Sequence, residues 1–187
     1  MSNPYIDSSL LDKALHFAID AHANTERRGK GFPYIIHPLE VVEIVATITN
    51  DQELLAAAAL HDTVEDTDVN IEQLREIFGE RIANVVAAES EDNCEAMSWL
   101  ERKTAALNRL RAASRDVKVV ALGDKLSNMR AIARDYQEIG DELWDRFHAP
   151  NGKQDHKWRY CALADALSEL KETCAYQEFV SLIGQTF

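Results

Sequence analysis

Cysteine is scarce in this sequence, and long apolar runs are missing. The three cysteines, Cys94, Cys161 and Cys174, are odd in number, widely spaced and form no C-x-x-C pair, which argues against a disulfide framework or a cysteine zinc site. No apolar stretch approaches the length that spans a membrane, and residues 1–9 hold no apolar signal core. We therefore expect a cytoplasmic protein without a membrane partner.

Basic residues are also few. The chain has 20 Lys and Arg residues against 32 Asp and Glu residues, which gives a formal net charge of −12. A general nucleic-acid binder needs a basic surface to displace counterions, so we expect no nucleic-acid partner. A small anionic substrate remains compatible with this charge, because a metal ion and a few local cations can hold one inside an acidic protein.

Strand patterns and internal repeats are absent as well. Apolar residues recur at three- and four-residue steps almost throughout the chain, which predicts an all-α protein. Its length of 187 residues fits a single domain covering residues 1–187. Expected N-caps are Asp7 or Ser8, Asp51 and Asn70. The expected helices are 10–19, 39–48, 52–61, 70–78, 81–88, 99–110, 117–132 and 158–173, with a loop at 147–155 and a short segment after the last helix.

A cluster of histidine and carboxylates follows the alanine-rich segment, in A-A-A-L-H-D-T-V-E-D-T-D, residues 57–68. His61 and Asp62 are adjacent and can converge on one metal ion. Glu65 and Asp66 lie one helical turn beyond them, on the same two faces. Carboxylates near a helix C-terminus are unfavourable without a cation, so the cluster indicates a metal site. A solvated helix end is the alternative for any single one of these charges.

Two further candidate ligands lie outside this cluster. His37 precedes Pro38 in Y-I-I-H-P, although a lone histidine before proline is more often a cap or a packed residue. Asp124 interrupts an apolar helical pattern at 119–130, and buried acids are normally paired or bound to metal. Asn128 follows one turn later. Mixed histidine and carboxylate ligands suit Mn²⁺, Fe²⁺, Zn²⁺ or similar ions, and they favour hydrolysis over redox chemistry.

These motifs, taken in order, resemble the hydrolase domain of the RelA/SpoT homologue superfamily. With no synthetase or regulatory region, the chain is similar to the stand-alone small alarmone hydrolases. The H-D pair alone is weak evidence for this family, but its combination with P-Y-x-x-H-P upstream and D-K-L-x-N downstream is highly specific for it. The matching segments are R-G-K-G-F-P-Y-I-I-H-P (28–38), A-A-L-H-D-T-V-E-D-T (58–67), F-G (78–79), E-R-K (101–103) and L-G-D-K-L-S-N-M-R (122–130).

The resemblance implies a fold, a metal and a reaction. The fold is an HD-domain bundle of roughly ten helices, the metal is usually Mn²⁺, and the small-molecule nucleotide substrate is (p)ppGpp. Hydrolysis removes its 3′-pyrophosphate and gives GDP or GTP and pyrophosphate. The residues implied are His37, His61, Asp62 and Asp124 as metal ligands, Glu65 and Asp66 as catalytic residues, and Arg28, Lys30, Lys103 and Asn128 as substrate contacts.

Some features depart from the family pattern and leave alternatives open. Lys30 is displaced by one position, and the resemblance fades after residue 130. The substrate could therefore be another nucleoside phosphate or NADPH. A non-catalytic nucleotide sensor ranks lowest because Glu65 and Asp66 are both present. Assembly into a homo-oligomer stays open. His22 could support the site from outside or simply pack in its helix, and we expect His156 to be solvated.

Overall fold

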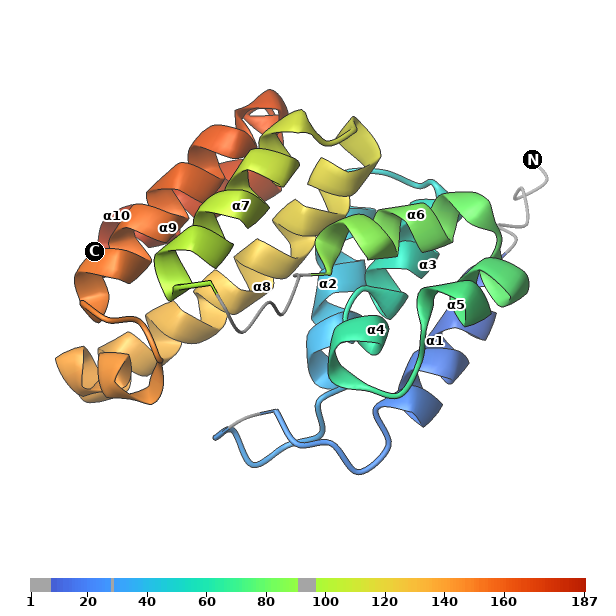
Figure 1. Cartoon of the computed structure of the whole chain (residues 1–187), viewed down its shortest axis with the longest axis horizontal. Coiled ribbons are helices and arrows are strands. Elements are labelled where there is room, and N and C mark those ends of the chain that lie inside the picture. The colour runs from blue at the N-terminus through green and yellow to red at the C-terminus, as the bar shows by residue number, and fades with distance from the viewer. Residues whose placement is uncertain (1–7, 28, 91–96) are drawn as a thin grey trace, which may run out of the picture. The chain divides into compact units, whose positions relative to one another are not determined.

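Helices form every regular element of the chain in the computed structural model, which describes residues 8–27, 29–90 and 97–187 (Figure 1). The all-α prediction and the prediction of roughly ten helices are confirmed for these residues. None of these helices is both long and apolar enough to cross a membrane. The elements are α1 (Ser9–Ala21), α2 (Ile36–Ala46), α3 (Gln52–Leu60), α4 (Thr63–Asp66), α5 (Ile71–Phe78), α6 (Glu80–Glu89), α7 (Trp99–Ala112), α8 (Arg115–Ile139), the 3-10 helix η1 (Gly140–Arg146), α9 (Lys153–Ala166), the 3-10 helix η2 (Ser168–Leu170) and α10 (Cys174–Thr186).

The helices group into two compact units, Met1–Ser90 and Glu91–Phe187. Blue to green colours mark the first unit in Figure 1, and yellow-green to red colours mark the second. The single domain expected over residues 1–187 stays a prediction. Three residues named in the sequence analysis, Asp7, Arg28 and Cys94, lie outside the described residues.

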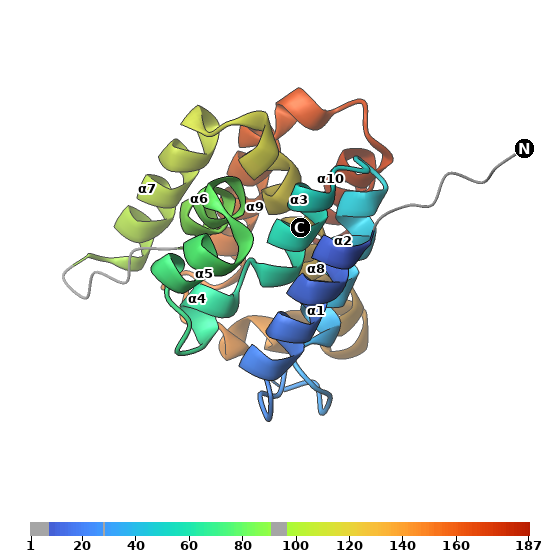
Figure 2. The same cartoon turned by 90° about the vertical axis from the view of Figure 1, so that its right-hand side faces the viewer.

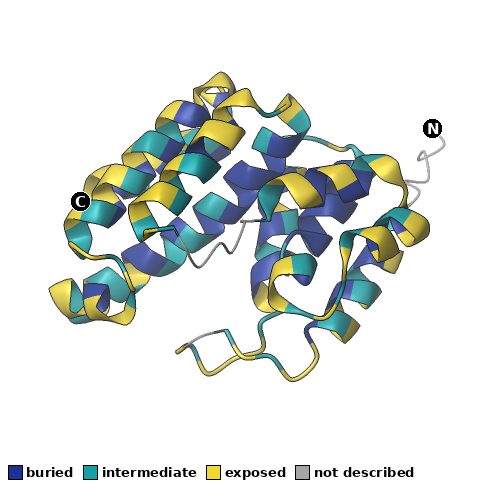
Figure 3. Ribbon diagram, viewed as in Figure 1, coloured by how far each residue is buried: buried dark blue, intermediate teal, exposed yellow. Residues whose placement is uncertain are grey.

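Helix α3 is the centre of the first unit, where it contacts α1, α2 and α6 (Figure 2). Every side chain from 54 to 60 is buried, and Figure 3 shows this segment in dark blue. Its alanines favour the helix and let neighbouring backbones approach closely. The predicted Asp51 cap is confirmed, because its carboxylate accepts a hydrogen bond from the backbone N–H of Glu53 at 3.0 Å. Arg81 of α6 then binds Asp51 at 2.8 Å and Glu53 at 2.7 Å, which fixes the start of α3.

The other predicted caps behave differently from one another. Asn70 forms a capping box with Gln73 at the start of α5, as predicted. That helix ends at Gly79, whose φ of 92° suits a residue without Cβ. Ser8 occupies the N-cap of α1 but makes no side-chain capping bond there. Helix α2 starts three residues earlier than predicted, so His37 lies inside its first turn.

Helix α8 is the central, largely buried helix of the second unit. It ends seven residues beyond the predicted last residue, 132. Helix α10 packs along it, and Arg130 of α8 binds Glu178 of α10 through two hydrogen bonds of 2.6 and 2.8 Å. The predicted short C-terminal segment is therefore wrong. Its sequence forms α10 because the Thr173 hydroxyl caps the helix and Phe179 is buried inside the unit.

The helix predicted at 158–173 is also placed differently. Helix α9 begins at Lys153, directly after Gly152 with its φ of 51°, and it ends at Ala166. The predicted loop is therefore shorter. The expectation of a solvated His156 is wrong as well, because this side chain is only 4% exposed and packs among aromatic rings.

Candidate metal centre

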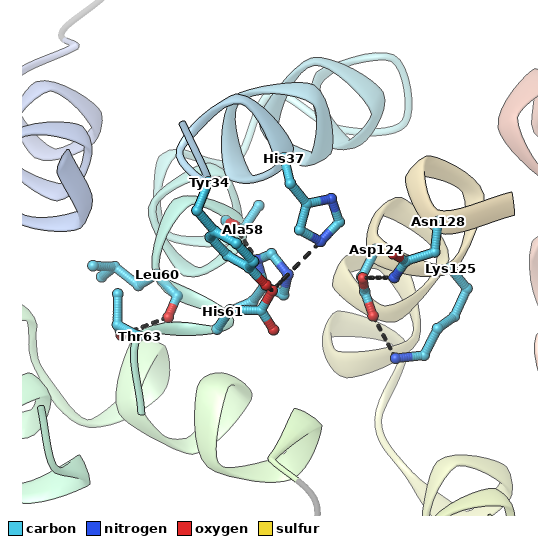
Figure 4. Close-up of polar contacts among 10 residues, drawn as sticks. Tyr34, His37, Ala58, Leu60, His61, Thr63, Asp124, Lys125 and Asn128 are labelled. Carbon is cyan, nitrogen blue, oxygen red and sulfur yellow. Dashed lines mark hydrogen bonds and ion pairs between the residues drawn. The ribbon is translucent and has the colours of Figure 1, made fainter. Parts of the chain in front are cut away.

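Three side chains of the first unit form a cluster that could hold a metal ion. His37, His61 and Asp62 each offer one ligand atom, and these atoms all lie within 4.8 Å of one another. Asp62 Oδ2 lies 2.9 Å from His61 Nε2 and 3.4 Å from His37 Nε2. Figure 4 shows His37 of α2 turned toward His61, which follows the last residue of α3. This sequence-predicted trio is therefore brought together by two segments of one unit, helix α2 and the junction between α3 and α4.

His61 is oriented by the helix that precedes it. It occupies the C-cap of α3, and its Nδ1 lies 2.9 Å from the backbone carbonyl oxygen of Ala58. A carbonyl oxygen only accepts hydrogen bonds, so Nδ1 carries the proton in this contact. In the neutral ring Nε2 is then left with its lone pair, on the side that faces Asp62. A hydrogen bond to the second ring nitrogen is how proteins usually orient a histidine for metal binding.

Asp62 is kept ionised although it lies inside the protein. Burial by itself raises the pKa of this carboxyl, but His61 and His37 in their protonated form supply positive charge and hydrogen bonds that outweigh burial and hold it well below its usual range. Tyr34 adds a further hydrogen bond, because its hydroxyl donates to Asp62 Oδ2 at 2.6 Å. Burial and the neighbouring Asp62 raise the pKa of Tyr34, so its hydroxyl stays a donor.

Glu65 and Asp66 lie on the short helix α4, which starts immediately after the cluster. The Thr63 hydroxyl donates to the carbonyl of Leu60 at 2.7 Å, so α3 passes into α4 without a long loop. Both carboxylates are exposed, and neither belongs to the three-residue cluster. Asp66 is nevertheless near enough to Tyr34 to contribute to the raised pKa of that phenol. Their exposure places both carboxylates at the protein surface, within four residues of Asp62 in the chain.

Asp124, the fourth predicted ligand, belongs to α8 in the second unit. It is only 6% exposed and has two polar neighbours on its own helix. The ammonium of Lys125 contacts its Oδ2, and the side-chain amide of Asn128 donates to its Oδ1 (Figure 4). This buried, hydrogen-bonded carboxylate agrees with the expectation that an acid in an apolar helix has partners. The role of Asn128 in substrate binding stays a prediction.

The predicted phosphate contacts are distributed over both units. Lys30 is half-buried in the loop between α1 and α2, where a bridge pairs Glu26 with Pro33. Arg27 of this loop lies over the Tyr34 ring, with its guanidinium carbon 5.3 Å from the ring centre. The loop therefore places the Arg27 cation directly against Tyr34, a residue that contacts Asp62.

Lys103 is half-buried on α7 of the second unit. Burial is the main cause that lowers the pKa of His156 to about 4. The positive charges of Arg159 and Lys103 act in the same direction, and Asp155 opposes them. Lys103 therefore lies near enough to His156 for its charge to act on that ring, and its contact with phosphate stays a prediction.

Two residues of the site were missed or undervalued by sequence reasoning. Tyr34 belongs to the P-Y-x-x-H-P motif, three positions before His37, and that spacing was the available signal. His22 gave no such signal beyond its position at the end of the first helix. In the structure it is 3% exposed and packs against Tyr34, with ring centres 4.8 Å apart and planes inclined by 31°. Both side chains lie beside the His37, His61 and Asp62 cluster without belonging to it.

The donor set of the cluster fits a divalent metal ion. It combines two imidazole nitrogens with one ionised carboxylate, the combination that binds Zn²⁺, Fe²⁺ and Mn²⁺ in proteins. The hydrogen bond from His61 to Ala58 and the one from Tyr34 to Asp62 provide the outer support that such ligands normally have. A cluster of this kind binds a metal and can present it to a phosphate ester.

Comparison with known proteins places this arrangement in a family. The HD domain family model matches residues 14–149. A probable guanosine-3′,5′-bis(diphosphate) 3′-pyrophosphohydrolase from Synechocystis is 33% identical over 183 residues, which cover 93% of this chain and 24% of that protein. The guanosine-3′,5′-bis(diphosphate) 3′-pyrophosphohydrolase MESH1 of Danio rerio is 36% identical over 131 residues, covering 68% of this chain and 71% of that protein.

Solved structures agree on the fold. The crystal structure of lmo0812 from Listeria monocytogenes EGD-e has a TM-score of 0.70 at 26% identity and covers 79% of this chain and 96% of its own. A metazoan SpoT orthologue that hydrolyses ppGpp has a TM-score of 0.77 at 22% identity and covers 99% of this chain and 98% of its own. The chain spans about a quarter of the length of the first curated relatives it matches, 24% and 26%. The chain therefore belongs to the HD domain family, and the resemblance to RelA/SpoT homologue hydrolases is confirmed.

Proposed function

We propose that this chain hydrolyses the 3′-pyrophosphate of guanosine 3′,5′-bis(diphosphate), ppGpp, and of its pentaphosphate analogue. The observation that carries the proposal is the His37, His61 and Asp62 cluster, with its ligand atoms within 4.8 Å, followed directly by Glu65 and Asp66. This order of residues lies in a chain whose relatives bear the names of such hydrolases. The products are GDP or GTP and intact pyrophosphate.

A divalent metal, proposed to be Mn²⁺, is held by His37, His61 and Asp62, with Asp124 as the fourth ligand. When bound, it supplies positive charge to a phosphoryl group and makes water more acidic. Asp124 is included because a buried carboxylate on the D-K-L-x-N motif is a suitable ligand. We further propose that the protein acts as a single domain in the cytoplasm on a small-molecule nucleotide.

The chain's own residues have three tasks in this reaction. Glu65 and Asp66 orient the attacking water and accept its proton, and their exposure on α4 makes them accessible. Arg28, Lys30 and Lys103 neutralise the dense phosphate charge, and Asn128 contacts the substrate. The water oxygen bonds to phosphorus, the bond from phosphorus to the 3′ oxygen breaks, and that oxygen takes a proton to become the ribose hydroxyl.

Product analysis in ¹⁸O-labelled water tests this proposal. Metal-free protein is reloaded separately with Mn²⁺, Mg²⁺, Zn²⁺ and Fe²⁺ and is given ppGpp, NADPH or nucleoside phosphates. We expect the fastest turnover with Mn²⁺ and ppGpp, with GDP and pyrophosphate as products and the label in pyrophosphate. Orthophosphate as the sole product would indicate a phosphomonoesterase. Rapid turnover of another nucleotide, with none of ppGpp, would overturn the substrate while keeping the hydrolase.

A further inference from the structure

Tyr34 lies beside the His37, His61 and Asp62 cluster, and the proposed chemistry gives it no role. We propose that Tyr34 is a positioning residue, whose hydroxyl fixes the Asp62 carboxylate for metal binding and whose ring links that carboxylate to the basic loop. The loop is defined here as residues 25–33. The inference rests on the metal centre of the proposed function, but it does not depend on the identity of the substrate.

The hydroxyl contact has the geometry of a strong hydrogen bond. Tyr34 donates to Asp62 Oδ2 at 2.6 Å, within the short range expected for a hydroxyl and a charged carboxylate. The same oxygen faces His61 and His37. A carboxylate oxygen has two lone pairs, so one can accept from the phenol while the other points toward the histidines. Without this bond the carboxylate could rotate about its side chain, and ordering it would oppose metal binding.

The ring of Tyr34 is held by its neighbours. The His22 ring packs against it in a tilted arrangement at 4.8 Å, and the His37 ring meets it edge-on at 5.9 Å between ring centres. Neither nitrogen of His22 has a hydrogen-bond partner among the residues that the structure describes. The His22 ring therefore contacts Tyr34 mainly through packing of the two rings. Packing of this kind fixes the rotamer of a supporting residue, which a positioning role requires.

Tyr34 also closes the basic loop. Its backbone N–H donates to the carbonyl of Thr25 at 2.8 Å, and the N–H of Arg27 donates to the carbonyl of Phe32 at 2.9 Å. The Arg27 guanidinium lies over the Tyr34 ring, a cation–π contact. One residue thus touches a metal ligand with its hydroxyl and a loop cation with its ring. Displacing the ring is expected to disturb the loop, whereas removing only the hydroxyl is expected to disturb Asp62 and the nearby Asp66 and to leave the loop in place.

Metal titration of the Tyr34→Phe variant tests the inference. Metal-free protein is titrated calorimetrically with Mn²⁺, and the visible absorption of the Co²⁺-loaded protein reports the ligand geometry. We expect the variant to bind Mn²⁺ about 10–100-fold more weakly, the usual effect of losing an outer partner of a ligand, and to show an altered Co²⁺ spectrum. Tyr176→Phe is the matched control, since it removes a hydroxyl that donates to the carbonyl of Ala164 at 2.9 Å, and it should behave like the wild type.

A second variant separates the ring from the hydroxyl. Tyr34→Leu removes both, so it should weaken metal binding as Tyr34→Phe does and in addition raise the KM for substrate through the loop. Circular dichroism checks that each variant remains helical. Wild-type metal affinity in folded Tyr34→Phe overturns the role of Tyr34 and leaves the metal centre intact. A wild-type protein that takes up no divalent ion overturns the metal centre and this inference together.

Discussion

His61 in the first unit and His156 in the second unit are buried in opposite ways. In the first unit His61 has a backbone carbonyl on one nitrogen and a carboxylate near the other. In the second unit His156 is surrounded by Phe147, Trp144 and Trp99, with ring centres 4.6, 5.5 and 6.1 Å away. Neither nitrogen of His156 has a hydrogen-bond partner among the described residues.

The difference shows that burial alone does not identify a functional histidine. Polar partners on both nitrogens make His61 suited to bind a metal, because they fix its tautomer and its direction. Aromatic neighbours instead make His156 a neutral packing element, whose pKa is lowered to about 4, first by burial. The comparison can be tested by changing each environment separately, and the variants below run from the largest expected effect to the smallest.

Removing the carboxylate beside His61 should have the largest effect on metal binding. Asp62→Asn keeps the size of the side chain but loses its charge beside His61 and His37. We expect metal binding to weaken by more than the ~100-fold typical of losing an outer partner, and activity to disappear with it. Elemental analysis after dialysis and calorimetric titration measure this. Full metal occupancy in the folded variant would show that the ligands are assigned wrongly.

Glu65→Gln should separate chemistry from metal binding. Glu65 is exposed on α4 and lies outside the ligand cluster, so the variant should keep its metal. We expect kcat to fall by roughly 10²–10⁴, the usual scale of positioned acid–base catalysis. Steady-state kinetics with matched metal analysis measure both quantities, and Asp66→Asn is the parallel variant. Normal turnover by Glu65→Gln would remove this residue from the mechanism.

The aromatic environment of His156 predicts a dependence of stability on pH. Its folded-state pKa of about 4 lies below the ordinary 6.5, so acid protonates the unfolded chain first. This contribution to stability is therefore complete above pH 6.5 and is lost as the pH falls toward 4, by about 2 kcal/mol at pH 5. His156→Phe should lose less stability than the wild type between pH 7 and pH 5.

Urea denaturation at each pH measures this difference. His148→Phe is the matched control, because it changes an exposed histidine and should leave the wild-type pH dependence in place. Equal loss of stability in the wild type and in His156→Phe would mean that His156 is protonated as easily in the folded protein as in the unfolded chain.

Lys103→Ala should have the smallest effect. The variant tests whether Lys103, a residue of the second unit, contacts the substrate. If Lys103 grips phosphate in the ground state, KM should rise about tenfold or less while kcat and metal affinity stay the same. The pKa of His156 should also rise slightly, since the charge of Lys103 lowers it. Kinetics and NMR titration of the histidine measure the two effects. Lys171→Ala, at an exposed lysine, is the control, and an identical KM in both variants would exclude the phosphate contact.

Much of the fold could be predicted because its signals are local. Asp51 and Asn70 cap helices through hydrogen bonds to residues two or three positions away, and the sequence displays both partners. His61 and Asp62 are neighbours in the chain, so their convergence was also visible. Apolar residues at three- and four-residue steps mark the buried face of each single helix, and this local pattern was enough to predict the all-α class.

The rest depended on contacts between distant segments. Tyr34 meets Asp62 across 28 positions, and no local pattern reports that bond. The burial of His156 depends on three rings from two other segments, α7 and the end of η1, and α10 depends on the burial of Phe179 inside its unit. Tertiary packing of this kind overrides local propensity. The roles of Asp124, Asn128 and the loop cations stay predictions.

The alanine run of α3 has a consequence for the way this protein can vary. Ala56, Ala57, Ala58 and Ala59 have no exposed surface, and α3 contacts three other helices. A larger side chain at any of these positions would force neighbouring backbones apart, at a typical cost of about 1–3 kcal/mol. His61 ends this helix and takes its orientation from Ala58. A substitution that looks like a minor core change would therefore also shift His61, so packing around α3 and the geometry of the candidate metal centre cannot vary independently.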